Sequence, residues 1–261
     1  MPVHIEHGAG PLRAVVLSPV LPIWDEGRFF EPLVQPLIDA GYRVTIFDTL
    51  SLLLEHPHSI QAFAARWSTC LSTMGRIDLL AGSALGGAVV QAMLGDAWVA
   101  NVPKVLLISA PSLADETLDT RLGSLADLGH AGNLADALTM LDQYIAPEGT
   151  SDSPISAPVA PETWRDQAAR LARGFTMLLD IDVRATVDRY TGRLLHVYGE
   201  RSQLVRRRNV HLRDSPLHAA RGIPNCGMRP LSHDVVAVLR AMRDHLHIDV
   251  APSQLIGGER T

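Results

Sequence analysis

The sequence predicts an α/β protein with a mostly parallel sheet, helices on both faces of that sheet, and a helical insertion near the middle of the chain. Two observations predict this class. Short, continuously apolar segments rich in Val, Ile and Leu alternate with longer segments of helical spacing, as in parallel strands that are buried on both faces. The chain also has 261 residues, of which 47% are hydrophobic, and this is enough for one large core.

The predicted elements follow from the period of the apolar residues. The predicted strands are residues 13–17, 42–47, 77–80, 105–109 and 194–198. The predicted helices are residues 29–40, 60–74, 86–94, 133–144, 161–179 and 235–245. The first helix contains internal prolines, which disfavour a helix interior, and Gly41 ends it.

The alternation breaks between residues 111 and 179, where two predicted helices flank a loop rich in Pro and Ser. An insertion after a strand of a parallel sheet lies over the crevice in which α/β proteins bind their ligands. We therefore expect a core of residues 1–110 and 180–250, a lid of residues 111–179, and a loose tail of residues 251–261. A surface excursion without a functional role is the alternative for the insertion.

Composition and charge exclude several classes of partner. The formal net charge of −5 predicts no nucleic-acid binding. The dense basic cluster Arg206–Arg208 is either a solvated helix face or an anchor for a substrate carboxylate. Two cysteines make no disulfide framework, and neither a signal peptide nor a membrane-length apolar run is evident. We expect a cytoplasmic protein that has no membrane partner.

The stretch IDLLAGSALGGAVV, which begins at Ile77, indicates the position of the site. It has the strand, tight glycine turn and helix of a nucleophile elbow, G-x-S-x-G. With Gly82 and Gly86 on the two glycines of the motif, the central residue is Ala84, and the nearest hydroxyl, Ser83, is one position early. An alanine side chain cannot attack a carbonyl.

The order of these parts resembles the α/β-hydrolase superfamily over almost the whole chain. The matching stretches are AVVLSPVLPIWDEGRFFEPLVQPLIDAGYRVTIFD for the first strands and the oxyanion loop, DLLAGSALGGAVVQAML for the elbow, VPKVLLISAPSL for the strand after the elbow helix, GRLLHVYGERSQLV for the strand and loop of the triad acid, and ARGIPNCGM for the last strand and the histidine loop. The resemblance implies that fold, with a site at the carboxyl ends of the strands.

The positions at which the family carries its chemistry all differ here. The usual His-Gly of the oxyanion loop is replaced by Ser18 and Pro19, and proline has no N–H to donate. The nucleophile position is Ala84, the acid position is Ser202 and the histidine position is Met228. A hydrolytic triad needs a nucleophile, a base and a group that orients the base. Four departures together favour a protein that does not use the triad.

The expected site is then an apolar pocket suited to binding. The expected substrate-binding residues are Pro19, Val20, Leu21, Ser83, Ala84, Leu85, Trp164, Ser202 and Met228. No catalytic residue is assigned; His233, which Ser232 would precede as an N-cap, is a weak candidate base. We expect neither a cofactor nor a metal, because His56 and His58 have ligand-like spacing but no third ligand. His196 is expected in the core.

Three functions remain open. A triad-deficient chain of this kind looks most like the bottromycin-type peptide epimerases of natural-product biosynthesis, which implies a modified peptide as substrate and exchange of an acidic α-hydrogen. A carboxylate of the substrate could be the base, because positioning and desolvation both assist it. The alternatives are a ligand-binding or carrier protein without catalysis, and a residual esterase or amidase that uses Ser83 and His233.

Overall fold

The structure is a computed structural model that describes residues 2–53, 59–150 and 163–250. A seven-stranded sheet in the order β1-β3-β2-β4-β5-β6-β7 forms its centre, and every pairing is parallel except that of β1 with β3. The strands are β1 His4–His7, β2 Leu12–Leu17, β3 Tyr42–Phe47, β4 Leu79–Ser83, β5 Lys104–Ile108, β6 Arg193–Gly199 and β7 His218–Ile223. The predicted fold class is confirmed. The short edge strand β1 has no counterpart among the predicted strands, and the predicted strand 77–80 begins and ends later than expected.

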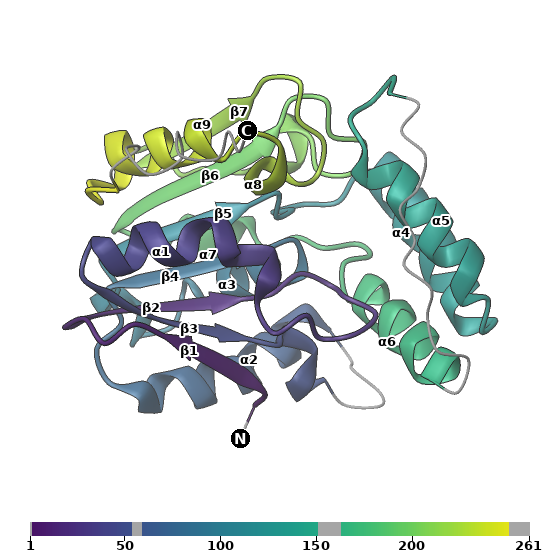
Figure 1. Cartoon of the computed structure of the whole chain (residues 1–261), viewed down its shortest axis with the longest axis horizontal. Coiled ribbons are helices and arrows are strands. Elements are labelled where there is room, and N and C mark those ends of the chain that lie inside the picture. Colours follow the sequence, from purple (N-terminus) through teal and green to yellow (C-terminus); the bar gives the residue numbers. More distant parts are fainter. Residues whose placement is uncertain (1, 54–58, 151–162, 251–261) are drawn as a thin grey trace, which may run out of the picture.

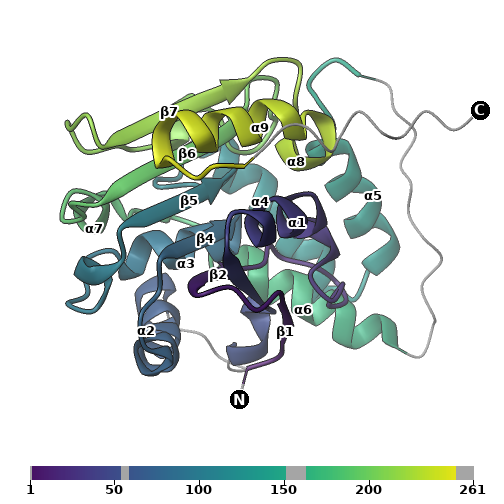
Figure 2. The same cartoon turned by 60° about the vertical axis from the view of Figure 1, so that its left-hand side comes forward.

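Helices cover both faces of this sheet (Figures 1 and 2). One face carries α1 Glu31–Asp39, α8 Pro230–His233 and α9 Val235–Ala241, and the other carries α2 Ile60–Leu71, α3 Leu85–Met93 and α7 Arg184–Val187. The predicted helix 235–245 ends as an α-helix at Ala241, and a π-helical turn, Met242–Leu246, continues it. The first proline of α1, Pro32, lies in the first turn, where no intrahelical N–H is needed.

Strand β2 shows why consecutive residues of the parallel strands are apolar. Side chains of a strand alternate between the two faces of the sheet. Val15 and Leu17 belong to the core layer on the α2–α3 face, whereas Ala14 and Val16 belong to the layer on the α1–α9 face. All four are buried. Helices cover both faces at these four positions, so all four are apolar; Arg13, near the start of the strand, is only half-buried.

Three helices between β5 and β6 form a group at the end of the sheet to which the parallel strands point (Figure 1). They are α4 Glu116–His130, α5 Leu134–Ile145 and α6 Trp164–Thr176. The side chains of Asp115 and Asn133 accept hydrogen bonds from backbone N–H groups in the first turns of α4 and α5, as N-caps do. These helices place the predicted insertion over the carboxyl ends of the strands; its role as a lid stays a prediction.

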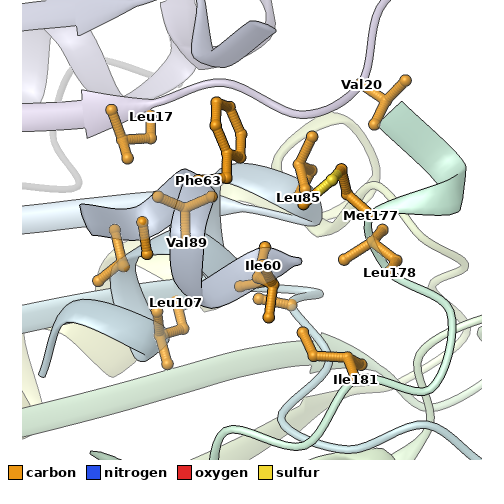
Figure 3. Close-up of a cluster of buried hydrophobic side chains, with 14 of the residues drawn as sticks. Leu17, Val20, Ile60, Phe63, Leu85, Val89, Leu107, Met177, Leu178 and Ile181 are labelled. Atoms are coloured by element: carbon orange, nitrogen blue, oxygen red, sulfur yellow. The ribbon is translucent and has the colours of Figure 1, made fainter. Parts of the chain in front are cut away.

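Gly86 in the first turn of α3 and Gly82 near the end of β4 let this helix pass close to strand β2. A Cβ on Gly86 would lie 2.2 Å from the carbonyl oxygen of Leu17, and a Cβ on Gly82 would lie 2.6 Å from the backbone of Gly86. No side chain fits at either position. The packing around this crossing is apolar: Figure 3 shows Leu17, Leu85 and Met177 within one cluster of buried side chains.

Candidate functional site

Ala84 is the apex of the turn between β4 and α3. Its backbone has φ 45° and ψ −114°. Residues other than glycine rarely adopt this conformation, and where they do the residue often lies at a functional site. The turn is held on both sides: the Ala84 N–H donates to the Ile108 carbonyl oxygen (3.1 Å), and the Ala84 carbonyl accepts from the Ala88 N–H (2.9 Å). The strained apex of this elbow therefore carries a methyl group.

Ser83 lies one residue before the apex and is the last residue of β4. It pairs with Ile108 of β5 in the regular parallel register, and its side chain is buried. Ser83 belongs to the strand ladder and does not occupy the strained position, although it lines the cavity described next.

A cavity with a volume of about 400 Å³ opens between the elbow and helices α4–α6. This is within the range of small-molecule sites. Its wall is mainly apolar. It is formed by the loop after β2, the elbow, the segment that contains α4–α6, the loop after β6 and the loop before α8. The lining residues are Pro19, Val20, Leu21, Pro22, Ile23, Phe29, Ser83, Ala84, Pro111, Leu118, Leu122, Leu138, Leu141, Asp142, Ile145, Thr163, Gln167, Phe175, Leu178, Leu204, Val205, Met228 and Arg229.

Six of the nine residues expected to bind substrate lie in this wall, and three do not. The six are Pro19, Val20, Leu21, Ser83, Ala84 and Met228. Leu85 is fully buried in the core, where its side chain lies beside that of Met177 (Figure 3). Trp164 begins α6 with 42% of its surface exposed. Ser202 is buried in the loop after β6, and its hydroxyl oxygen has no hydrogen-bond partner among the described residues.

His233 lies outside the wall of the cavity. It is the last residue of the short helix α8, its side chain is exposed, and its Nδ1 accepts a hydrogen bond from the Gly227 N–H (3.3 Å). The expected N-cap at Ser232 is wrong, because α8 already begins at Pro230, a residue suited to a first helical position. The cap of α9 is Asp234, whose carboxylate accepts from the Ala237 N–H (2.9 Å).

The wall contains polar groups that sequence reasoning did not assign. Asp142 comes from α5, Gln167 from α6, and Arg229 from the residue directly after Met228. Burial lowers the pKa of the Arg229 guanidinium, and the charges of Asp142 and Asp25 act in the opposite direction. Arg229 could have been predicted from the sequence, because it directly follows Met228, which was already expected in the pocket.

The arginine cluster expected as a possible carboxylate anchor lies elsewhere. Arg206 pairs with Glu148 (3.0 Å), and Arg208 pairs with Asp115. No member of the cluster is among the described residues of the cavity wall. The geometry favours a surface network of ion pairs.

His196 lies in the core, as expected, and is fully buried on β6. Its Nε2 accepts a hydrogen bond from the Ala110 N–H (3.4 Å). Burial lowers the pKa of His196 to about 3, and the charge of Arg207 adds to this effect. His196 is therefore neutral at neutral pH.

The part of the chain that the structure describes was expected to hold no metal site. No group of three or more His, Cys, Asp or Glu side chains there is arranged to hold an ion. His56 and His58 lie outside the described residues. Within the described ranges, no helix has the length and apolar character that a membrane crossing needs.

Comparisons with known proteins bear on the fold. No family model matches the sequence, and no curated protein matches it. Among solved structures, a bromoperoxidase from Bacillus anthracis has a TM-score of 0.72 at 18% identity, with 94% of each chain covered. A putative non-heme bromoperoxidase from Mycobacterium tuberculosis has a TM-score of 0.72 at 16% identity, covering 95% of this chain and 96% of its own.

A 2-hydroxy-6-oxo-6-phenylhexa-2,4-dienoate hydrolase from Rhodococcus sp. strain RHA1 has a TM-score of 0.68 at 18% identity, with 94% of each chain covered. These identities are too low to transfer an activity, since one fold hosts many functions. The order of strands, the strained elbow and the agreement over almost the whole chain lead to one structural conclusion: this chain has the α/β-hydrolase fold.

Proposed function

We propose that this protein binds a small apolar molecule, such as a modified peptide intermediate of natural-product biosynthesis, beneath α4–α6 and acts on it without an acyl-enzyme. One observation carries the proposal: Ala84 stands at the strained apex of the elbow, facing an apolar cavity of about 400 Å³. Covalent catalysis needs a nucleophile at that point, and a methyl group supplies none.

The partner positions support the same conclusion. Met228, at the histidine position, has a thioether whose sulfur accepts a hydrogen bond from the Val205 N–H (3.5 Å). Ser202, at the acid position, is buried away from the cavity wall. Neither side chain can take a proton from a nucleophile at neutral pH.

The catalytic form of the proposal is epimerisation by exchange of an acidic α-hydrogen. A base removes the proton, the neighbouring carbonyl or unsaturated ring holds the charge, and a proton returns to the other face. The N–H groups in the first turn of α3 have no partner within the helix and would stabilise negative charge developing on a substrate oxygen beside Ala84. A cavity of this kind needs to position the reactants and exclude water, and positioning alone can contribute about 7–11 kcal/mol in favourable cases.

Two carboxylates are candidates for the base. One is a carboxylate of the substrate, whose basicity rises in an apolar cavity because burial disfavours the charged form. The other is Asp142 of α5, a carboxylate of the protein that lines the cavity. Asp142→Asn separates the two, because exchange survives this change when the substrate supplies the base.

Mass spectrometry in deuterated water tests the proposal. The protein is incubated with modified peptides that carry a stereocentre next to an unsaturated ring. We expect a gain of one dalton without cleavage, and a matched incubation with the heat-denatured protein should show no gain. Fragments, or a gain of the mass of water, would establish hydrolysis and favour Ser83 with His233. Binding without any change of mass would establish a carrier.

A further inference from the structure

Arg229 is the cationic side chain that the described residues contribute to the cavity wall. It follows Met228 in the loop before α8, and its backbone carbonyl caps that helix by accepting from the Ser232 N–H (3.0 Å) and the His233 N–H (3.2 Å). The loop therefore fixes its position. Most of the rest of the wall is aliphatic or aromatic, so a charge there meets little solvent to screen it.

No described residue forms a hydrogen bond or an ion pair with the Arg229 guanidinium. Other partly buried arginines of this chain have such partners. Arg170, whose side chain is 20% exposed, pairs with Asp48 and donates to the Leu21 carbonyl, and Arg206, at 30%, pairs with Glu148. A guanidinium carries five N–H donors, and a partly buried one without an acceptor is destabilising. The N–H donors of Arg229 therefore have no acceptor among the described residues, although Asp142 and Asp25 act on its charge.

We propose that Arg229 binds a carboxylate of the ligand, so that the substrate class is a compact apolar molecule, or an apolar peptide segment, with one carboxylate. This rests on the proposed function, because it assumes that the cavity binds the substrate. A carboxylate paired with a guanidinium is held in its charged form and is less basic, so in this binding mode Asp142 is the candidate base. The planar fork of a guanidinium matches a carboxylate through two parallel hydrogen bonds. The aliphatic wall from α4 and α5, including Leu122, Leu138 and Leu141, would take the apolar body.

The charges around the cavity favour a single carboxylate over a phosphate. Asp142 lies in the same wall and, with Asp25, acts on Arg229 electrostatically. The described wall has no second cation to neutralise a dianion. A monoanion would add one negative charge beside Arg229, whereas a phosphate dianion would add two, and the second charge would have no cation of the described wall to offset it in an apolar site.

A pair of probes that differ only in charge tests this role. The probes are 4-phenylbutanoate and its neutral amide, which have nearly the same shape, and their dissociation constants are measured by calorimetry at pH 7.5. We expect the wild-type protein to bind the carboxylate at least tenfold more tightly than the amide. Arg229→Met should remove this preference and leave amide binding within threefold, and Arg229→Lys should keep part of the preference.

Arg243→Met is the matched control, since Arg243 is an exposed arginine that pairs with Asp244 and does not line the cavity, and it should keep the full preference. Thermal melting of both Arg229 variants establishes that they are folded, and Arg229→Lys decides the question if Arg229→Met is unstable. Equal binding of the two probes to the wild type, or a preference that survives in Arg229→Met, would overturn the role of Arg229 alone. Failure of both probes to bind the wild type would overturn the ligand-binding cavity with it.

Discussion

Ala84 combines a costly backbone conformation with a side chain that has no chemistry. Strain of this kind costs about 1–3 kcal/mol and persists only where the surroundings impose it. Here the surroundings are the close crossing of α3 over β2, which glycines at positions 82 and 86 permit. The elbow is thus part of the packing between α3 and β2, and it also forms part of the cavity wall.

Restoring the hydroxyl at this apex tests whether the rest of a hydrolytic site is present. We expect Ala84→Ser to hydrolyse 4-nitrophenyl butyrate at a rate within about threefold of the wild type, because a serine without a base stays protonated. The triple variant Ala84→Ser, Met228→His, Ser202→Asp is the comparison, and an effective general base would raise the rate by about 10²–10⁴. A hundredfold increase in Ala84→Ser alone would reveal a working base elsewhere, such as His233.

His196 gives the protein a pH dependence with a defined sign. Its folded pKa of about 3 lies below the value of about 6.5 expected in the unfolded chain. Above pH 6.5 the histidine is neutral in both states. As the pH falls from 6.5 towards 3, the unfolded chain binds a proton that the folded protein excludes, and stability falls by up to about 1.4 kcal/mol per pH unit.

Urea unfolding at pH 7 and pH 5 measures this effect. We expect His196→Gln, which keeps a hydrogen-bond acceptor, to reduce the difference in unfolding free energy between the two pH values by about 2 kcal/mol. The exposed His4→Gln variant is the control and should keep the wild-type difference. An unchanged difference in His196→Gln would show that other groups govern the acid sensitivity.

At the scale of elements, we expect replacement of two glycines on different helices by alanine to change the free energy of unfolding in opposite directions. A Cβ at Gly86 of α3 would meet the Leu17 carbonyl oxygen at 2.2 Å, and this carbonyl belongs to the backbone of a central strand, which cannot move aside. A Cβ at Gly123 of α4 would meet nothing within 4 Å. We expect Gly86→Ala to cost more than about 4 kcal/mol or to prevent folding, and Gly123→Ala to stabilise by about 0.5–1 kcal/mol. Chemical denaturation measures both, and a stable Gly86→Ala protein would contradict the close crossing.

The side chain of Arg170 ties helix α6 to the loops that follow β2 and β3. Arg170 donates from Nε to the Leu21 carbonyl (2.8 Å) and pairs with Asp48, whose carboxylate is 5% exposed and also caps the turn after β3. Without Arg170 the Asp48 charge would be buried and uncompensated. We expect Arg170→Met to cost about 2–4 kcal/mol and to speed hydrogen exchange in α6.

The neighbouring Arg173→Met serves as the control for this change, because among the described residues the Arg173 side chain donates to the Ala169 carbonyl of its own helix alone. It should lower stability by less than about 1 kcal/mol. Equal effects of the two substitutions would mean that the contact with Asp48 does not hold α6.

At the scale of the whole molecule, the sequence predicted the fold better than the cavity wall. Strand β3 was predicted with its observed bounds, because its apolar, β-branched residues favour a strand through local sequence alone. The edge strand β1 is short and alternates between exposed and half-buried residues, so no apolar run marks it. Leu118, Gln167 and other wall residues from α4–α6 escaped prediction, because the rotation of each helix depends on packing between segments that are distant in sequence. For the same reason Leu85 was expected in the wall but packs into the core.

The cavity links the stability of the whole molecule to its ligand, because its wall joins the elbow to α4, α5 and α6. A ligand that binds only the folded state at one hundred times its dissociation constant stabilises by about 2.7 kcal/mol, which for a chain of this size is a rise in Tm of about 5 °C or more. We expect 4-phenylbutanoate to produce this rise in the wild type. Leu138→Trp should abolish it, because Leu138 lines the cavity and a larger side chain would fill it. Thr139→Trp, which places the same side chain on the exposed side of α5, should keep the full rise in calorimetric melting. A rise that persists in Leu138→Trp would place the binding site outside the cavity.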